Sequence, residues 1–176
     1  MDKIREEILS CTKCPLYKGR RNAVPGEGNI HSHIIFVGEA PGENEDNKGI
    51  PFCGASGAFL DQLLSSIELI RKDVFITNIV KCRPPANRDP KSSEISKCKD
   101  YLQRQIDIIS PKVICTLGRF SMNYFFPDFY ISKVHGNIFN FENRKIISMY
   151  HPAVALYNDN MKKILMDDFQ ILKQFI

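Results

Sequence analysis

Four of the six cysteines have a spacing that is typical of a metal site. Cys11 and Cys14 form a C-x2-C motif, and Cys82 and Cys98 lie far downstream of it. Four thiolates suffice to hold a tetrahedral zinc ion or an iron–sulfur cluster, and spacing alone leaves both open. The alternative is that the cysteines are inert buried thiols. We interpret the remaining two, Cys53 and Cys115, in this way.

A second group of reactive side chains follows short apolar runs along the chain. These segments are Gly38–Gly42, Asn78 and Tyr150–Pro152, the last of which contains His151. If the apolar runs are parallel strands, their carboxyl ends meet at one edge of a sheet, where ligands bind in such folds. We therefore expect the three segments to lie close together and to form a binding site.

The loop that begins at Gly38 does not match the common phosphate-binding motifs. It lacks the G-x-G-x-x-G pattern, and Lys48-Gly49 does not complete a G-x-x-x-x-G-K-S/T loop. Its acidic residues would repel a phosphate: Glu39, Glu43, Glu45 and Asp46. The loop suits recognition of a neutral polar group, with a solvated acidic loop as the alternative.

Strands that alternate with helices are expected to position these residues. Apolar runs predict strands over 34–37, 74–77, 113–117, 138–141 and 146–149, and 3.6-residue periodicity predicts helices around 60–67, 95–109 and 164–172. This alternation predicts an α/β fold in which helices cover both faces of a parallel sheet. With 176 residues and no linker or repeat, we expect a single domain over residues 1–176.

Composition narrows the class of protein. Hydrophobic residues make up 43% and charged residues 25%, which is ordinary globular usage. No apolar run reaches the roughly 20 residues of a membrane helix, and the amphipathic start MDKIREEILS is unlike a signal peptide. We therefore expect a cytoplasmic protein without a membrane partner. The net charge of +4 is compatible with a polyanionic partner without requiring one.

Four segments together resemble the family 4 uracil-DNA glycosylases, the iron–sulfur group of thermophilic bacteria and archaea. The segments, in the family's order, are CTKCPL, VGEAPGENEDNKGIPFCGASG, TNIVKCRPPANR and YHPA. The resemblance implies a three-layer α/β/α sandwich around a four-stranded, mainly parallel sheet. It also implies a 4Fe-4S cluster on Cys11, Cys14, Cys82 and Cys98, which would tie down an N-terminal iron–sulfur segment, and a monomer that acts on uracil-containing DNA.

The same resemblance assigns three roles that the chemistry supports. Phe52 would stack on a uracil flipped out of DNA. The Asn78 carboxamide would donate to uracil O4 and accept from N3–H, a pattern that cytosine reverses. His151 would place an imidazole N–H against the negative charge that develops around O2 as the glycosidic bond breaks.

The remaining site residues lie in the first motif. Family 1 enzymes carry an aspartate where this chain has Ala40, which cannot activate water. We therefore expect either that Glu39 or a backbone carbonyl positions the water, or that the sugar cation forms first and captures water unaided. The tyrosine that excludes thymine in family 1 corresponds to Gly42, which leaves Glu45 as the candidate for that task. Backbone amides around Glu39–Pro41 are candidates for binding uracil O2, although Pro41 has no N–H.

Basic residues in the loops near the predicted site are candidates for binding DNA phosphates: Lys13, Lys18, Arg20, Arg21, Lys81, Arg83 and Arg88. The hypothesis is a monofunctional glycosylase that hydrolyses the N-glycosidic bond and leaves an abasic site, without lyase activity because no amine nucleophile is assigned. Two alternatives remain: a non-catalytic iron–sulfur or zinc protein that binds nucleic acid, and an electron carrier.

Overall fold

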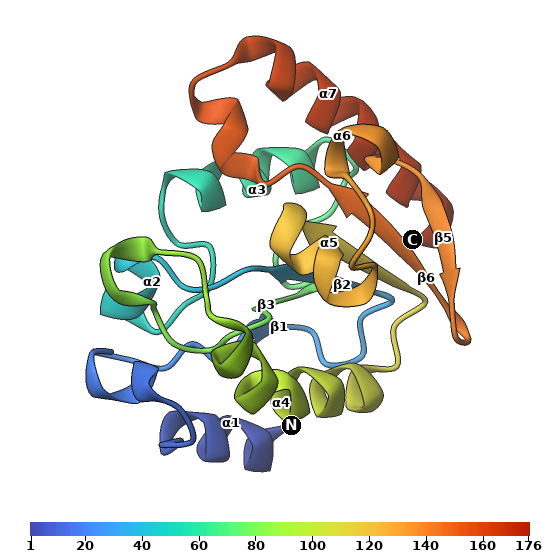
Figure 1. Cartoon of the computed structure of the whole chain (residues 1–176). Helices are drawn as coiled ribbons and strands as arrows, with labels where there is room; N and C mark the ends of the chain where they lie inside the picture. Colours follow the sequence, from blue (N-terminus) through green and yellow to red (C-terminus); the bar gives the residue numbers. More distant parts are fainter.

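The computed structural model describes all 176 residues, and a six-stranded sheet forms its centre (Figure 1). The strands are β1 (Glu27–Gly28), β2 (Ile34–Gly38), β3 (Phe75–Asn78), β4 (Val113–Leu117), β5 (Ile138–Phe141) and β6 (Arg144–Met149), in the order β1-β3-β2-β4-β6-β5. The four central strands are parallel, and β1 and β5 pair antiparallel at the edges. The predicted four-stranded parallel sheet is confirmed as the centre of a larger sheet, which two edge strands complete.

Helices cover both faces of this sheet, as the buried apolar strands require. The helices are α1 (Asp2–Leu9), α2 (Glu43–Lys48), α3 (Ala55–Ser65), α4 (Ser92–Ile109), α5 (Arg119–Phe125), α6 (Ile131–Val134) and α7 (Asp159–Gln170), with 3-10 turns η1 (Pro15–Lys18), η2 (Pro85–Asn87), η3 (Pro152–Leu156) and η4 (Ile171–Phe175). Within β2, Ile34 and Phe36 pack with α3 and α7, whereas Ile35 and Val37 pack with α4. This alternation gives the three layers.

The N-terminal segment forms a smaller core of its own against α4. Ile4 and Ile8 are the buried residues of α1, and they pack with Tyr101 and Cys98 of α4. Leu9, the last residue of α1, does not join them and is 47% exposed. Figure 1 shows α1 and α4 side by side at the bottom of the molecule, beneath the sheet.

Two local elements differ from the sequence-based expectation. Residues 38–57 were expected to be a loop, but they contain α2, whose first turn carries the acidic residues Glu43, Glu45 and Asp46. Acidic side chains are favourable at the positive end of a helix, which explains why this acidic stretch becomes helical. The turn-rich segment before β2 contributes β1, which pairs with β3.

The parallel strands place their carboxyl ends at one edge of the sheet. Gly38, the last residue of β2, is in register with Asn78, the last residue of β3. The chain leaves β4 and β6 at the same edge, into Gly118 and into Tyr150-His151. None of the helices combines the length and the apolar character needed to cross a membrane.

Candidate active site and cysteine pocket

A cavity of about 450 Å³ opens at the carboxyl edge of the sheet, and we call it the strand-end pocket. Six residues singled out in the sequence line it: Ala40, Gly42, Glu45, Phe52, Asn78 and His151. They come from the end of β3 and from the segments that follow β2 and β6, so the expectation that these segments converge is confirmed. The cavity has the size and mixed lining of a small-molecule site.

Two other predicted residues lie outside this pocket. Glu39 lines a second pocket of about 340 Å³. His151 lines both this second pocket and the strand-end pocket. Pro41 is buried and lines neither pocket. Glu39 and Asn78 therefore line different pockets, and His151 lines both.

Asn78 reaches the strand-end pocket because its neighbour in the sheet is a glycine. A Cβ on Gly38 would lie 2.3 Å from Asn78 Oδ1 and 2.8 Å from the Phe52 ring, so any side chain there would displace both. The Asn78 backbone carbonyl accepts a hydrogen bond from Lys81 Nζ (2.8 Å). Its carboxamide has no hydrogen-bond partner in the protein, although Asn78 is only 2% exposed. Its amide atoms are not among the fully buried polar atoms that lack a partner, so they are open to the cavity and available to a ligand.

The backbone around Phe52 is held in an uncommon conformation. Phe52 has a φ of 49°, in the left-handed region that bulky residues rarely adopt. Arg71 donates hydrogen bonds to the carbonyls of Pro51 (3.0 Å) and Phe52, and a Cβ on Gly57 would clash with the Phe52 carbonyl. In this conformation the Phe52 ring lies over the His151 ring, with the two centroids 5.5 Å apart and the planes inclined by 28°.

His151 is held as a neutral imidazole with a defined tautomer. Its Nδ1 accepts a hydrogen bond from the Ala153 backbone N–H (3.2 Å), so the ring proton is on Nε2. Burial lowers the pKa of His151 to about 4, and the carboxylate of Glu45 opposes this effect. At neutral pH the side chain is therefore a neutral N–H donor at the wall of the strand-end pocket.

The pKa of Glu39 is shifted in the opposite direction from that of His151. Burial and the nearby Asp89 raise the pKa of its carboxyl to about 7, while Arg119 opposes this shift. The carboxyl is thus poised to take or release a proton near neutral pH, in a pocket that also contains part of His151. Carboxyl and imidazole pKa values that are pushed apart in this way are typical of acid–base sites.

Glu45 forms a fixed part of the wall. Its Oε2 accepts from the Gly42 N–H (3.0 Å), and its Oε1 accepts from the N–H groups of Cys53 (3.0 Å) and Gly54 (3.3 Å). These bonds tie the start of α2 to the loop that carries Phe52. The Gly42 amide is therefore already used and is not free for a ligand.

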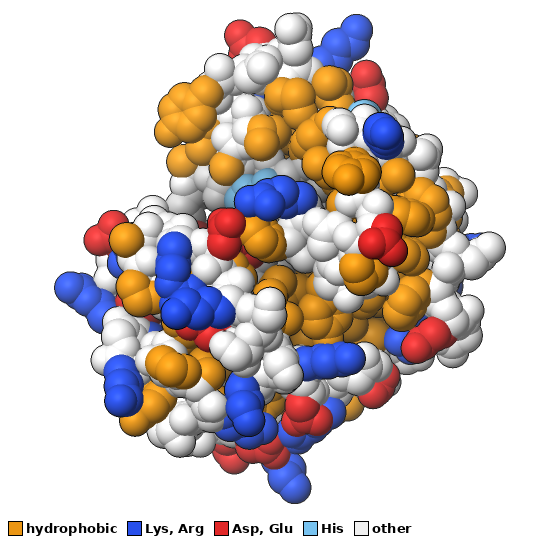
Figure 2. Space-filling model, viewed as in Figure 1, with side chains coloured by type: hydrophobic (Ala, Val, Ile, Leu, Met, Phe, Trp, Pro, Cys, Tyr) orange, Lys and Arg blue, Asp and Glu red, His pale blue; other side chains and the backbone are white.

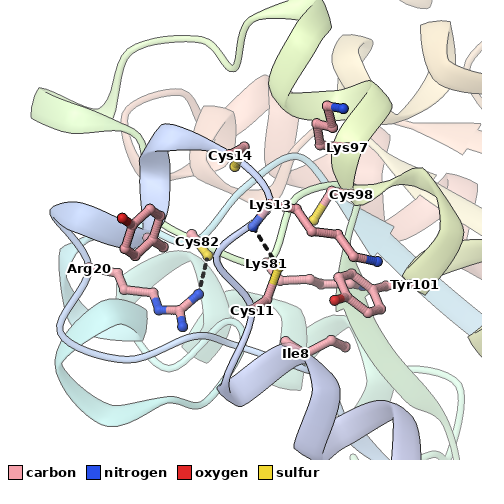
Figure 3. Close-up of a pocket in the computed structure, with 11 residues that line it drawn as sticks. Ile8, Cys11, Lys13, Cys14, Arg20, Lys81, Cys82, Lys97, Cys98 and Tyr101 are labelled. Carbon is pink, nitrogen blue, oxygen red and sulfur yellow. Dashed lines mark hydrogen bonds between the residues drawn. The ribbon is translucent and has the colours of Figure 1, made fainter.

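Four cysteines line one pocket next to α1 and α4 (Figure 3): Cys11, Cys14, Cys82 and Cys98. Cys115 is buried within β4 and Cys53 lies in the loop near Phe52, so neither joins them. Arg20 Nη1 donates to Cys82 Sγ (3.1 Å), as Figure 3 shows, which suits sulfur ligands that carry negative charge. No three ligand-type side chains of the chain converge on a single ion position.

The prediction for one basic residue is wrong. Lys81 is 1% exposed, and its Nζ donates to Thr77 Oγ1 (2.6 Å), the Asn78 carbonyl (2.8 Å) and Gln105 Oε1 (2.7 Å), so it cannot bind a phosphate. The spacing after β3 gave no sign that this lysine turns into the core. Other basic side chains gather over the part of the surface that carries α1, α2 and α4 (Figure 2).

Sequence reasoning missed several residues of the site. Ser56, Asn87 and Ala153 also line the strand-end pocket, and Arg119 lines the second pocket. Arg119 follows Gly118 directly after β4, so the rule that located Asn78 and His151 would have found it too. Arg71 acts on Phe52 from a distance of 19 residues in sequence, and no motif marks it.

Comparisons with known proteins agree with this architecture. Residues 25–170 match the family model described as the uracil DNA glycosylase superfamily. The chain is 52% identical to the type-4 uracil-DNA glycosylase of Sulfurisphaera tokodaii, over 99% of this chain and 84% of that protein. It is 48% identical to the Archaeoglobus fulgidus enzyme of the same name (97% and 90%) and 41% identical to that of Thermotoga maritima (100% and 94%). The chain therefore belongs to the uracil DNA glycosylase superfamily and, within it, to the type-4 uracil-DNA glycosylases.

Proposed function

We propose that this chain binds a uracil flipped out of DNA in the strand-end pocket and hydrolyses its N-glycosidic bond, leaving an abasic site. Uracil-DNA glycosylase activity in base excision repair is the function of its family, and uracil-containing DNA is the substrate. The observation that carries the proposal at the level of residues is one shared cavity, in which the unpartnered Asn78 carboxamide, the Phe52 ring and the neutral His151 imidazole meet.

Asn78 provides base recognition. Its amide N–H can donate to uracil O4 while its oxygen accepts from N3–H, and cytosine presents a donor and an acceptor in the reverse order. The unpartnered, nearly buried position of Asn78 makes this selective, because a mismatched base leaves buried polar groups unpaired at about 1–3 kcal/mol each.

Phe52 and Glu45 give the pocket its shape. The Phe52 ring offers a flat surface for stacking, which contributes about 1–3 kcal/mol per base. Glu45 is our candidate for excluding thymine, because three backbone N–H groups fix its carboxylate. A wall fixed in this way cannot move aside for a methyl group without losing those bonds.

His151 acts on the bond-breaking step. As the C1′–N1 bond breaks, its electron pair moves onto the base, and negative charge collects around O2. The Nε2–H of a neutral imidazole can donate to O2, and this bond strengthens as the charge develops. The Ala153 amide on Nδ1 supports this role because it fixes the proton on Nε2.

Glu39 is our candidate for positioning the water. The cationic sugar left at C1′ takes up the water oxygen, and Glu39 accepts the proton that this water loses, which completes hydrolysis. Glu39 lines the pocket that shares His151 with the strand-end pocket, which supports this order of groups. No lysine lines either pocket, which supports a monofunctional enzyme without a Schiff-base step.

We infer that the cysteine pocket holds a 4Fe-4S cluster. Four sulfurs line this one pocket, and membership of the type-4 uracil-DNA glycosylases supports an iron–sulfur cluster there. Cys11, Cys14, Cys82 and Cys98 would hold the cluster, which when bound supplies a covalent link between the N-terminal segment, the chain after β3, and α4.

A single-uracil oligonucleotide tests the proposed activity. Incubation followed by alkali should break the strand at the uracil, while matched oligonucleotides with cytosine or thymine stay intact. The His151→Ala variant is the matched control, because it should retain the fold and lose most of the cleavage. An intact uracil strand after incubation with the iron-loaded protein would favour the binding-protein or electron-carrier alternative.

A further inference from the structure

Three cavities form a continuous row along the carboxyl edge of the sheet. The strand-end pocket shares His151 with the second pocket, and the second pocket shares Arg119 and Ile131 with a third pocket of about 430 Å³. The third pocket is lined by residues of α5, α6 and the loop between them, among them Phe129 and Tyr130. If a uracil occupies the strand-end pocket, these neighbouring cavities offer a path along the sheet edge for the sugar–phosphate chain attached to it.

Arg119 is the only lysine or arginine that lines any of the three cavities. The other charged residues in their linings are acidic: Glu39, Glu45, Asp89 and Asp128. A flipped nucleotide carries a phosphate on each side, and a negatively charged row of cavities would repel both. Binding of such a strand therefore depends on Arg119 more than on any other side chain in the row.

The guanidinium of Arg119 is held by two weak contacts. It lies 4.0 Å from the centre of the Phe120 ring and 3.2 Å from the carboxylate of Asp89. The Arg119 and Asp89 side chains are 63% and 62% exposed, and ion pairs of such exposed groups contribute little to stability. Stacking on Phe120 keeps the planar group oriented, so its donors can change partner without moving far.

We propose that Arg119 exchanges Asp89 for a DNA phosphate next to the flipped uridine. In the free protein the Arg119 guanidinium forms an ion pair with Asp89. In the complex a phosphate replaces Asp89 as its partner, while the guanidinium remains stacked on the Phe120 ring. Asp89 is thus a competitor of the DNA backbone for one cation. This inference rests on the proposed function, because it assumes that the uracil enters the strand-end pocket.

A double-mutant cycle tests the exchange. The probe is a single-stranded oligonucleotide with one 2′-fluoro uridine, a sugar substitution that slows cleavage, and the measurement is its Kd at several salt concentrations. Arg119→Gln should weaken binding about tenfold and lower the salt slope by about 0.7. Asp89→Asn should tighten binding about two- to fivefold, and this gain should vanish in the Arg119→Gln background.

The outcomes separate exchange from a general charge effect. Equal tightening by Asp89→Asn with and without Arg119 would overturn the proposal, as would an unchanged Kd and salt slope in Arg119→Gln. Arg5→Gln, which removes an exposed arginine of α1 outside all three cavities, is the matched control. Both Arg119 and Asp89 are exposed, so the variants should fold, and melting curves check this.

A neutral linkage locates the phosphate. A methylphosphonate on one side of the uridine should weaken binding to the wild-type protein about tenfold and should cause no further loss in Arg119→Gln. Equal losses in both proteins at every linkage would assign the phosphate contacts to other residues and end the proposal. Uracil excision by the wild-type protein in the same buffer tests the proposed function separately from these binding results.

Discussion

The ionisation of Glu39 should control the pH dependence of uracil excision. Burial and the neighbouring Asp89 raise the pKa of this carboxyl to about 7, whereas burial lowers the pKa of His151 to about 4. From about pH 5 to pH 8 His151 therefore stays neutral, and Glu39 changes from about 1% to about 90% ionised. If only the carboxylate can accept the proton from water, the rate follows that fraction.

Single-turnover excision rates at constant ionic strength measure this profile. The logarithm of the rate should rise with a slope near one per pH unit and level off above about pH 7. In Glu39→Gln the rise should disappear and the plateau rate should fall about 100-fold. Asp89→Asn is a useful control, because removing the like charge should move the midpoint to lower pH.

The pH dependence of protein stability should also report the ionisation of Glu39. The folded pKa of Glu39 lies above its ordinary value of 4.5, so between these values the folded state binds more protons than the unfolded state. The free energy of unfolding should therefore fall as pH rises through this window, by about 1–2 kcal/mol because solvent screens this half-buried carboxyl, and Glu39→Gln should remove that fall. A flat rate profile in the wild-type protein, or a Glu39→Gln variant that keeps the slope, would refute the role of Glu39.

Four further changes test the rest of the site. His151→Ala should lower kcat about 100- to 1000-fold with little change in uracil-DNA affinity, and equal losses in both would contradict a transition-state role. Asn78→Asp should lower the preference for uracil over cytosine about 5- to 100-fold in competition assays, and an unchanged preference would move recognition elsewhere. Arg71→Gln should lower the free energy of unfolding by about 2 kcal/mol in urea titrations and raise KM, because the Pro51 and Phe52 carbonyls lose their donor. Cys98→Ala should reduce iron content and solubility together, and full iron occupancy would remove Cys98 from the ligand set.

The parallel centre of the fold and the meeting of its strand ends were predictable from the sequence. Buried strands covered on both faces read as continuous apolar runs, and 34–37 and 113–117 are such runs. Once those strands are parallel, the positions of Asn78 and His151 follow from topology alone. The edge strand β1 was not predictable in this way, because two residues carry no periodicity.

The locations and hydrogen-bond partners of the charged side chains were the least predictable part of the site. Lys81 lies between residues of a strand-end motif, and only the folded structure shows that Gln105 of α4 accepts a hydrogen bond from its ammonium group in the core. Glu45 similarly looks like a surface residue of an acidic loop, yet it ties two loops together through backbone N–H groups. Both outcomes depend on partners that are distant in sequence, which no local pattern encodes.

The rigidity of the pocket follows from contacts that hold its wall in place. Arg71 and Gly57 maintain the backbone of Phe52, Gly38 leaves room for its ring, and Glu45 joins α2 to the Phe52 loop. A preformed pocket loses little entropy when the base enters, so the energy of recognition can be used to offset the cost of flipping, which is a few kcal/mol. This explains why the side chains that would touch uracil stay fixed, whereas Arg119, which would meet the mobile DNA backbone, rests on exposed and exchangeable contacts.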